Sequence, residues 1–160
     1  MRVRRNAFAA VVVSSLLAVA AHAQVPQYGN NITLEQARRA IAAAEAEANR
    51  NGWPVAIAVV DTAGMLVAFQ RTDNTQTASI AVAVDKASSS AMYRRPSKAF
   101  QDAVAGGGVG VRALNLRGAS AVDGGIPLTV GGKIVGAIGV SGVTADQDGQ
   151  IAKAGVDGLK

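Results

Sequence analysis

The fold is decided by residues 124–142, which read GGIPLTVGGKIVGAIGVSG. Two apolar runs flank Gly131-Gly132, and this pair predicts a tight hairpin turn, because a two-residue hairpin loop needs the positive φ that glycine adopts at little cost. The second run, residues 133–141, contains Gly136 and Gly139. Glycine inside a strand is typical of a bulge or of close approach by another backbone or a ligand. The hairpin therefore predicts a tightly packed sheet or a binding surface.

The residues before this hairpin predict a helix followed by an earlier hairpin. Thr33 and Gln36 have the spacing of a capping box, and helical periodicity continues from there to Arg50. Two apolar runs then flank Asp61–Gly64, which has aspartate first and glycine fourth, as a type I turn prefers. The expected elements are a helix over 34–50 and strands over 55–60 and 65–71.

The rest of the chain predicts further helices and short strands around the glycine hairpin. Helices are expected over 75–94 and 98–104, the first ending because the residue before Pro96 avoids helical geometry. Residues 109–116 read as a turn and a short strand, 119–122 as another short strand, and Thr144 opens a last helix that ends near Gly158. The order α-β-β-α-α-β-β-β-α predicts one α+β domain over 33–160, with a central antiparallel sheet flanked by helices, after a flexible lead-in over 24–32.

The N-terminus has the layout of a secretory signal peptide. Three arginines precede an apolar run over 8–20, and Ala21-His22-Ala23 gives a small-x-small cleavage site. The apolar run is shorter than the roughly 20 residues that span a membrane. We expect cleavage after Ala23 and a periplasmic or secreted protein with no stable membrane span.

Cleavage would leave a chain without histidine or cysteine. His22 is the one histidine and there is no cysteine, which excludes a Ser-His-Asp triad, a thiol nucleophile and a His/Cys zinc site. The mature chain would keep 13 of its 16 basic residues against 11 acidic ones, a net charge of +2. Because these charges are scattered, no nucleic-acid partner is expected.

These pieces together resemble the GlcG/HbpS-type haem-binding family. The resemblance covers about residues 33–155. It is carried by Val59-Val60-Asp61-Thr62-Ala63-Gly64, Arg71, Asp85-Lys86-Ala87, Arg95-Pro96-Ser97, Gly124-Gly125-Ile126-Pro127-Leu128, Val135–Gly142, Asp148 and Ala154-Gly155.

The resemblance implies a profilin-like or sensor-like α/β domain that forms homo-oligomers. Some secreted members of the family bind haem, and haem degradation has been ascribed to them, whereas others are encoded beside glycolate or diol metabolism. The chain departs from the family pattern at Ser88-Ser89-Ser90 and at the glycine loop 106–108. Both departures fall where a pocket is expected, so the resemblance fixes the fold better than the ligand.

A cationic corner after the second expected helix is the first candidate binding site. Tyr93, Arg94, Arg95 and Lys98 lie close together in sequence, and the cations are suited to pair with carboxylates such as haem propionates. The alternative is a helix end whose cations complement the helix dipole. The full set of candidate ligand-binding residues, in a crevice between this helix, the corner and the glycine strand, is Tyr93, Arg94, Arg95, Lys98, Lys86, Ser89, Gly136 and Gly139.

An iron ligand would have to come from oxygen or sulfur, or from a lysine. The candidates are Tyr93, Tyr28, Met92 and Met65. Packing is the simpler role for both methionines, with Met65 expected in the core. Lys86 is expected either to extend along the surface or to meet an acidic group across a subunit contact.

Three functions follow from these observations. The first is a secreted or periplasmic oligomeric binding protein for haem or a similar small ligand. The second is an enzyme that degrades haem or acts on a small organic acid, although the lack of histidine and cysteine favours a protein that is not an enzyme. The third is a structural or regulatory module that partners a sensor protein.

Overall fold

The computed structural model describes residues 25–160, and the predicted signal peptide lies outside the described residues. The helices and strands follow one another in the order of an α+β fold, with the strands in two consecutive pairs. In chain order the elements are α1 (Leu34–Asn51), β1 (Ala56–Asp61), β2 (Leu66–Arg71), α2 (Ser79–Tyr93), α3 (Lys98–Ala105), the 3-10 helix η1 (Gly108–Asn115), β3 (Gly125–Val130), β4 (Lys133–Ser141) and α4 (Ala145–Asp157).

The four strands form one antiparallel sheet in the order β2-β1-β4-β3. The two hairpins are thus joined side by side through their inner strands, β1 and β4. Val59 lies opposite Ile138, and Ala58 lies opposite Gly139. The predicted class, a central antiparallel sheet flanked by helices, is confirmed.

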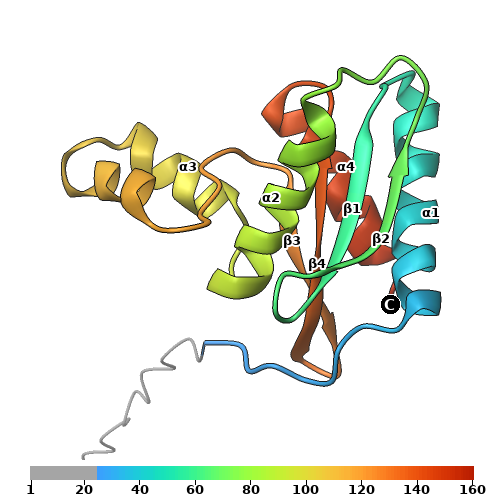
Figure 1. Cartoon of the computed structure of the whole chain (residues 1–160), viewed down its shortest axis with the longest axis horizontal. Helices are drawn as coiled ribbons and strands as arrows, with labels where there is room; N and C mark the ends of the chain where they lie inside the picture. Colours follow the sequence, from blue (N-terminus) through green and yellow to red (C-terminus); the bar gives the residue numbers. More distant parts are fainter. Residues whose placement is uncertain (1–24) are drawn as a thin grey trace, which may run out of the picture.

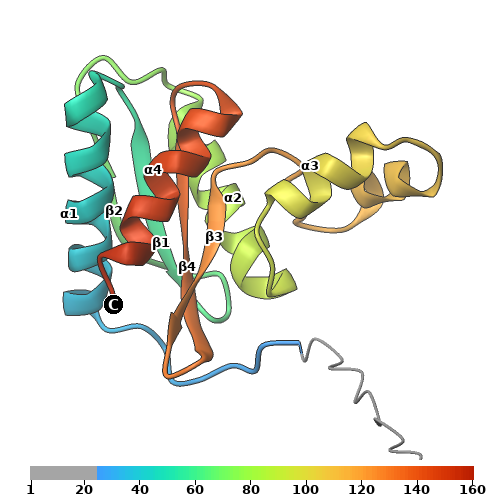
Figure 2. The same ribbon diagram turned by 180° about the vertical axis from the view of Figure 1, so that it is seen from behind.

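Helices cover both faces of the sheet. α1 and α4 lie against one face and α2 against the other (Figures 1 and 2). The alternation of side chains along β1 divides the core accordingly. Ile57 and Val59 pack in the larger cluster under α1 and α4, whereas Ala58 and Val60 pack in an alanine-rich cluster under α2.

The glycine hairpin has the predicted turn. Gly131 and Gly132 have φ angles of 56° and 76°, the left-handed values that a two-residue turn of this type requires. Gly139 in β4 allows the close approach of α2: a Cβ there would lie 2.1 Å from the carbonyl oxygen of Ala83. Of the alternatives that the strand glycines predict, the structure shows close approach by another backbone.

Both predicted capping boxes are present. The Thr33 hydroxyl accepts a hydrogen bond from the Gln36 amide, and the Gln36 side chain accepts one from the Thr33 amide. Thr144 and Gln147 repeat this arrangement at α4. These local bonds satisfy amide groups that the first turn of a helix leaves without partners.

The segment between α3 and β3 differs from its sequence-based expectation. Residues 108–115 form η1 rather than a turn and a strand, and residues 119–122 are not a strand. The Gly107 and Gly108 backbones have positive φ, and this local geometry folds η1 back onto α3. We call residues 98–116 the arm, because α3 and η1 extend away from the sheet (Figure 1).

None of the helices within residues 25–160 is both long enough and apolar enough to cross a membrane.

Candidate functional site

The best-defined polar contact in the core joins the two layers of helices. The Lys86 ammonium of α2 lies 2.7 Å from the Asp148 carboxylate of α4, and both side chains are almost fully buried. The same ammonium donates to the carbonyl oxygen of Val140 at 3.0 Å, and the other Asp148 oxygen accepts from the Val143 amide. The pair therefore links helices from opposite faces of the sheet, and α2, β4 and α4 position it.

Two glycines leave the space that this pair occupies. A Cβ on Gly124 would lie 2.9 Å from Lys86 Nζ and 2.6 Å from the Val140 carbonyl oxygen. At Gly125 it would lie 2.3 Å from the Lys86 carbonyl oxygen. The absence of side chains at Gly124 and Gly125 therefore leaves room for Lys86 beside the start of β3.

Lys86 was expected to extend along the surface or to meet an acid across a subunit contact. Both expectations are wrong, because its partner is Asp148 of the same chain and the ammonium is buried. Burial raises the pKa of the Asp148 carboxyl above its ordinary value, and the hydrogen bond from Lys86 opposes that rise. An amine engaged in this way is not available to a ligand.

The cationic corner brings its predicted residues together but engages most of them. The Tyr93 hydroxyl donates to the carbonyl oxygen of Arg117 at 2.8 Å. The Arg95 guanidinium lies 5.6 Å from the ring centre of Phe100, and Lys98 pairs with Asp102 on α3. The corner thus holds the arm to the end of α2.

Arg94 also lies in this corner. It adopts the left-handed backbone conformation that ends α2, with φ at 54°. Its guanidinium lies 5.4 Å from the ring centre of Tyr28, and the Tyr28 hydroxyl donates to the Ala91 carbonyl oxygen at 2.9 Å. These contacts hold the lead-in segment against the C-terminal end of α2.

Three other predicted site residues lie inside the fold. The Ser89 hydroxyl is buried and accepts from the Ser120 amide at 2.9 Å. Gly136 and Gly139 are covered by backbone, since a Cβ on Gly136 would lie 2.2 Å from the Val60 carbonyl oxygen. The crevice expected against the glycine strand is therefore filled by helix and strand backbone.

A cavity of about 410 Å³ lies instead on the outer side of α2. It is lined by Asp85, Ser88 and Met92 from α2, and by the loop Gly118–Ser120. The Ser88 hydroxyl donates to the carbonyl oxygen of Gly64, which holds the β1–β2 turn against the helix. Tyr93 in turn fixes the start of the loop through Arg117. We call this space the Met92 cavity.

Both methionines differ from their expected packing roles. Met65 was expected in the core, but 66% of it is exposed. Met92 is 44% exposed, and it lines the cavity with its thioether 3.5 Å from the position of a Cβ on Gly64. Met92 is thus a sulfur donor at the wall of a partly apolar space.

Of the other residues of this wall, only Ser88 had been connected with a pocket from the sequence, as part of the serine run over 88–90. Asp85, Ser88 and Met92 are spaced by three and four residues, so they lie on one face of a helix. That spacing is a signal available from the sequence. The sequence gives no comparable signal for Gly118–Ser120, because the position of this loop depends on how the arm returns to the sheet.

Three larger cavities have a different chemical character. Their volumes are about 550 Å³ beside Trp53 and Arg71, about 440 Å³ beside Arg38 and Phe69, and about 590 Å³ beside Tyr28 and Lys133. All three have mainly polar linings. Within residues 25–160 no group of three or more acidic or histidine side chains could hold a metal ion.

Comparison with known proteins places these features in context. Residues 32–157 match the family described as "Haem degrading protein HbpS-like". The chain is 37% identical to protein GlcG of Escherichia coli K12 over 110 residues, which are 69% of this chain and 81% of that protein.

Two solved structures share the fold. The crystal structure of HbpS is 30% identical and has a TM-score of 0.75, covering 84% of this chain and 94% of that one. A crystal structure of a PduOC:haem complex has a TM-score of 0.73 over 81% of this chain and 96% of that one. Its identity to this chain is 22%, so this second likeness concerns the fold alone.

Proposed function

We propose that this chain, which belongs to the HbpS-like family of haem-degrading proteins, binds haem in the Met92 cavity. The observation that carries the proposal is the half-exposed thioether of Met92 in the wall of that cavity. Methionine sulfur is an established axial ligand of haem iron. No histidine or cysteine competes for that role within residues 25–160.

The chemistry of the lining fits one face of a porphyrin. Three of the six lining residues, Met92, Gly118 and Ala119, have no nitrogen or oxygen in their side chains. The volume of about 410 Å³ is within the usual range of roughly 300–1,000 Å³ for a small-molecule pocket. Such a pocket would cover part of the macrocycle and leave an edge in water. Met92 would ligate the iron, and haem would supply its own redox chemistry there.

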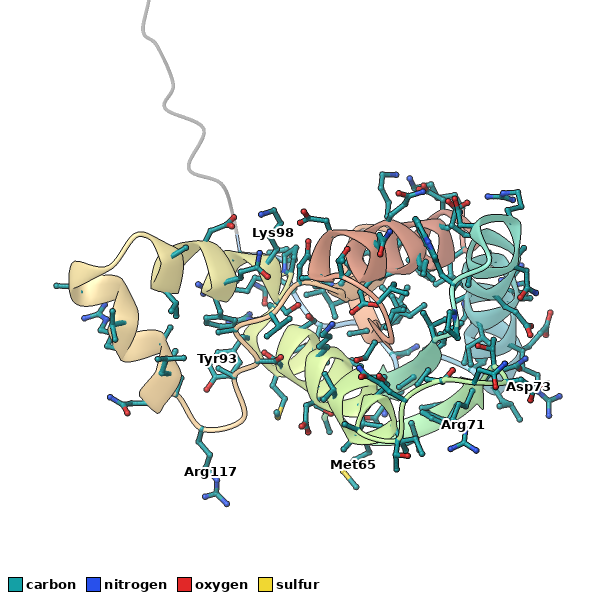
Figure 3. All side chains as sticks on the ribbon, turned by 90° about the horizontal axis from the view of Figure 1, so that it is seen from above. Met65, Arg71, Asp73, Tyr93, Lys98 and Arg117 are labelled. Carbon is teal, nitrogen blue, oxygen red and sulfur yellow. The ribbon has the colours of Figure 1, made fainter. Side chains whose placement is uncertain are left out.

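Cations near the cavity are suited to hold the propionates. Arg117 immediately precedes the lining residue Gly118, and Arg94 follows Met92 by two residues. Neither arginine forms an ion pair within the described part of the chain. Figure 3 shows that the Arg117 side chain points outward. It lies on the same side of the molecule as Met65, which belongs to the β1–β2 turn. A guanidinium without an ion-pair partner can donate two parallel hydrogen bonds to a carboxylate that arrives with a ligand.

The test is a haem titration of the mature chain followed by absorbance in the Soret region. We expect a saturable band at a fixed ratio of haem per subunit. Weak absorbance that rises without saturation, as for haem in an unrelated protein of similar size, would contradict the proposal. The secretory pattern in residues 1–23 supports a periplasmic or secreted location, which cell fractionation would test.

Haem breakdown is a second candidate function, favoured by the description of the family. The chain supplies no histidine or cysteine within its described residues, so its role would be to hold haem while reductant and oxygen react at the haem itself. If haem, reductant and oxygen gave more breakdown product with the protein than without it, degradation would be supported. An equal yield with and without the protein would support haem binding without degradation.

A further inference from the structure

The polar cavity of about 550 Å³ lies where the C-terminal end of α1 meets the end of β2. Its walls come from the last turns of α1, the link over 52–54 and the segment over 71–74. None of these residues lines the Met92 cavity. Figure 3 shows Arg71 and Asp73, which belong to the wall, at the end of the molecule away from Arg117. We call this space the Trp53 cavity.

Hydrogen bonds hold the two sides of the Trp53 cavity in place. The Thr72 hydroxyl accepts from the Val55 amide at 2.9 Å, and the Thr72 amide donates to the Val55 carbonyl oxygen at 3.0 Å. The Trp53 amide donates to the carbonyl oxygen of Ala48, and its half-buried side chain packs against the larger core cluster. The backbone on both sides is therefore ordered before a ligand arrives, which lowers the entropic cost of binding.

Charges of both signs line the Trp53 cavity without pairing with each other. Arg71 and Asp73 both belong to the wall, and within residues 25–160 neither takes part in an ion pair. The third charged residue of the wall is Glu45, whose Oε1 accepts a hydrogen bond from the Gln70 side chain at 2.5 Å. A guanidinium can donate two parallel hydrogen bonds to a carboxylate, and a carboxylate accepts from an ammonium group. A ligand that carries both charges would satisfy both sides of the cavity.

The end of α1 favours the cationic half of such a ligand. Asn49 and the helix cap Gly52 both line the cavity. The C-terminal end of a helix carries a partial negative charge that stabilises a nearby cation. The indole ring of Trp53, in the same wall, also attracts cations and covers apolar groups.

We propose that the Trp53 cavity binds a free α-amino acid in its zwitterionic form. Arg71 holds the α-carboxylate, Asp73 holds the α-ammonium group, and the rest of the ligand lies against Trp53. The volume of about 550 Å³ is within the usual range of roughly 300–1,000 Å³ for a small-molecule pocket. A dicarboxylate would bring a second negative charge toward Asp73 and Glu45, and an uncharged sugar would leave both charges of the wall unpaired.

The first test uses the fluorescence of Trp53, which is the one tryptophan of the chain and so reports on this cavity. Each protein amino acid would be titrated into the haem-free mature chain up to about 10 mM, ten times a Kd of about 1 mM, with calorimetry as the second readout. We expect saturable binding of at least one of them. If no amino acid bound, or if glucose bound and no amino acid did, the proposal would be overturned.

Blocked ligands test the two charges without altering the protein. N-acetylation removes the ammonium charge of the amino acid that binds, and conversion to its amide removes the carboxylate charge. Each change should weaken binding at least tenfold, because each leaves one charge of the wall without its partner. Binding of either blocked ligand as tight as that of the free amino acid would show that the cavity does not recognise a zwitterion.

Variants then assign each charge to its residue. Arg71→Leu should weaken binding at least tenfold, whereas Arg39→Leu, at an exposed position of α1 outside the described wall, should leave it unchanged. Asp73→Asn should weaken binding of the free amino acid but not that of its N-acetyl derivative. Equal affinity of the unaltered protein and Arg71→Leu would overturn the proposal. Because haem is left out of all these titrations, failure here leaves the haem-binding proposal standing.

Discussion

Lys86 and Asp148 form a buried ion pair, 2.7 Å between ammonium and carboxylate, although 62 residues separate them in the chain. The pair crosses from one face of the sheet to the other beside the start of β3, where Gly124 and Gly125 leave room. A buried pair of this kind adds little net stability, because desolvation offsets the attraction. It does make the relative placement of α2 and α4 specific, since a buried charge without its partner is costly.

Removing the lysine should therefore destabilise the protein strongly. Lys86→Met leaves the Asp148 carboxylate buried without its cation, and we expect a loss of about 3–5 kcal/mol in the free energy of unfolding. Urea denaturation followed by circular dichroism measures it. Lys98→Met is the matched control: its pair with Asp102 is exposed, and such pairs are worth about 0–1 kcal/mol. Equal losses for the two variants would contradict a special role for the buried pair.

The same pair predicts a pH dependence with a definite sign. Burial raises the pKa of Asp148 in the folded state above its ordinary value of 3.8. In the pH window between 3.8 and the folded pKa, the folded state binds more protons than the unfolded state. The contribution of Asp148 to stability therefore increases as the pH falls through that window.

Asp148→Asn removes this titration and so isolates it. We expect the unfolding free energy of the unaltered protein, relative to the variant, to increase between pH 7 and pH ~4. Urea denaturation of both proteins across that range is the measurement. A relative stability that decreases on acidification would show that Lys86 outweighs burial and that the pKa is lowered.

Gly139 should not tolerate even a methyl group. A Cβ there would lie 2.1 Å from the Ala83 carbonyl oxygen and 2.5 Å from the Ala87 amide nitrogen, both on the backbone of α2. Gly139→Ala must displace that helix, and we expect destabilisation at or above the upper end of the roughly 1–3 kcal/mol typical of overpacking.

Gly106→Ala provides the comparison. Gly106 has helical backbone angles, and a Cβ there would meet nothing closer than 3.5 Å. The substitution should be neutral or stabilise by up to about 1 kcal/mol. Thermal unfolding of the two variants decides the matter, and a Gly139→Ala protein as stable as Gly106→Ala would contradict the close approach of α2.

Local signals in the sequence were sufficient for much of the fold. The turn at Gly131-Gly132 and the capping boxes at Thr33 and Thr144 depend on residues within a few positions of one another, and all three are present. The secondary structure of the segment 109–122 was harder to predict from local signals. Its short apolar runs fit strand and helix equally well, and the glycines at 107 and 108 direct the chain into the arm.

The candidate site was less accessible from the sequence, because tertiary contacts decide the role of each residue. Lys86 looked available to a ligand until its partner, far away in sequence, was known. A glycine at position 139 is compatible both with close packing of another backbone and with the approach of a ligand. Only the position of α2, which lies against Gly139, distinguishes between these two roles. Met92 was recognised as a sulfur donor, but its exposure depends on the loop over 118–120.

Met92→Ala tests the central claim most directly, because it removes the one sulfur donor of the proposed haem site. Met65→Ala is the matched control: that thioether is exposed but does not line the cavity. Haem affinity would be measured for the unaltered protein and both variants by Soret titration. We predict at least a tenfold loss for Met92→Ala, about 1.4 kcal/mol, and none for Met65→Ala. Equal affinity in all three proteins would contradict haem binding in the Met92 cavity.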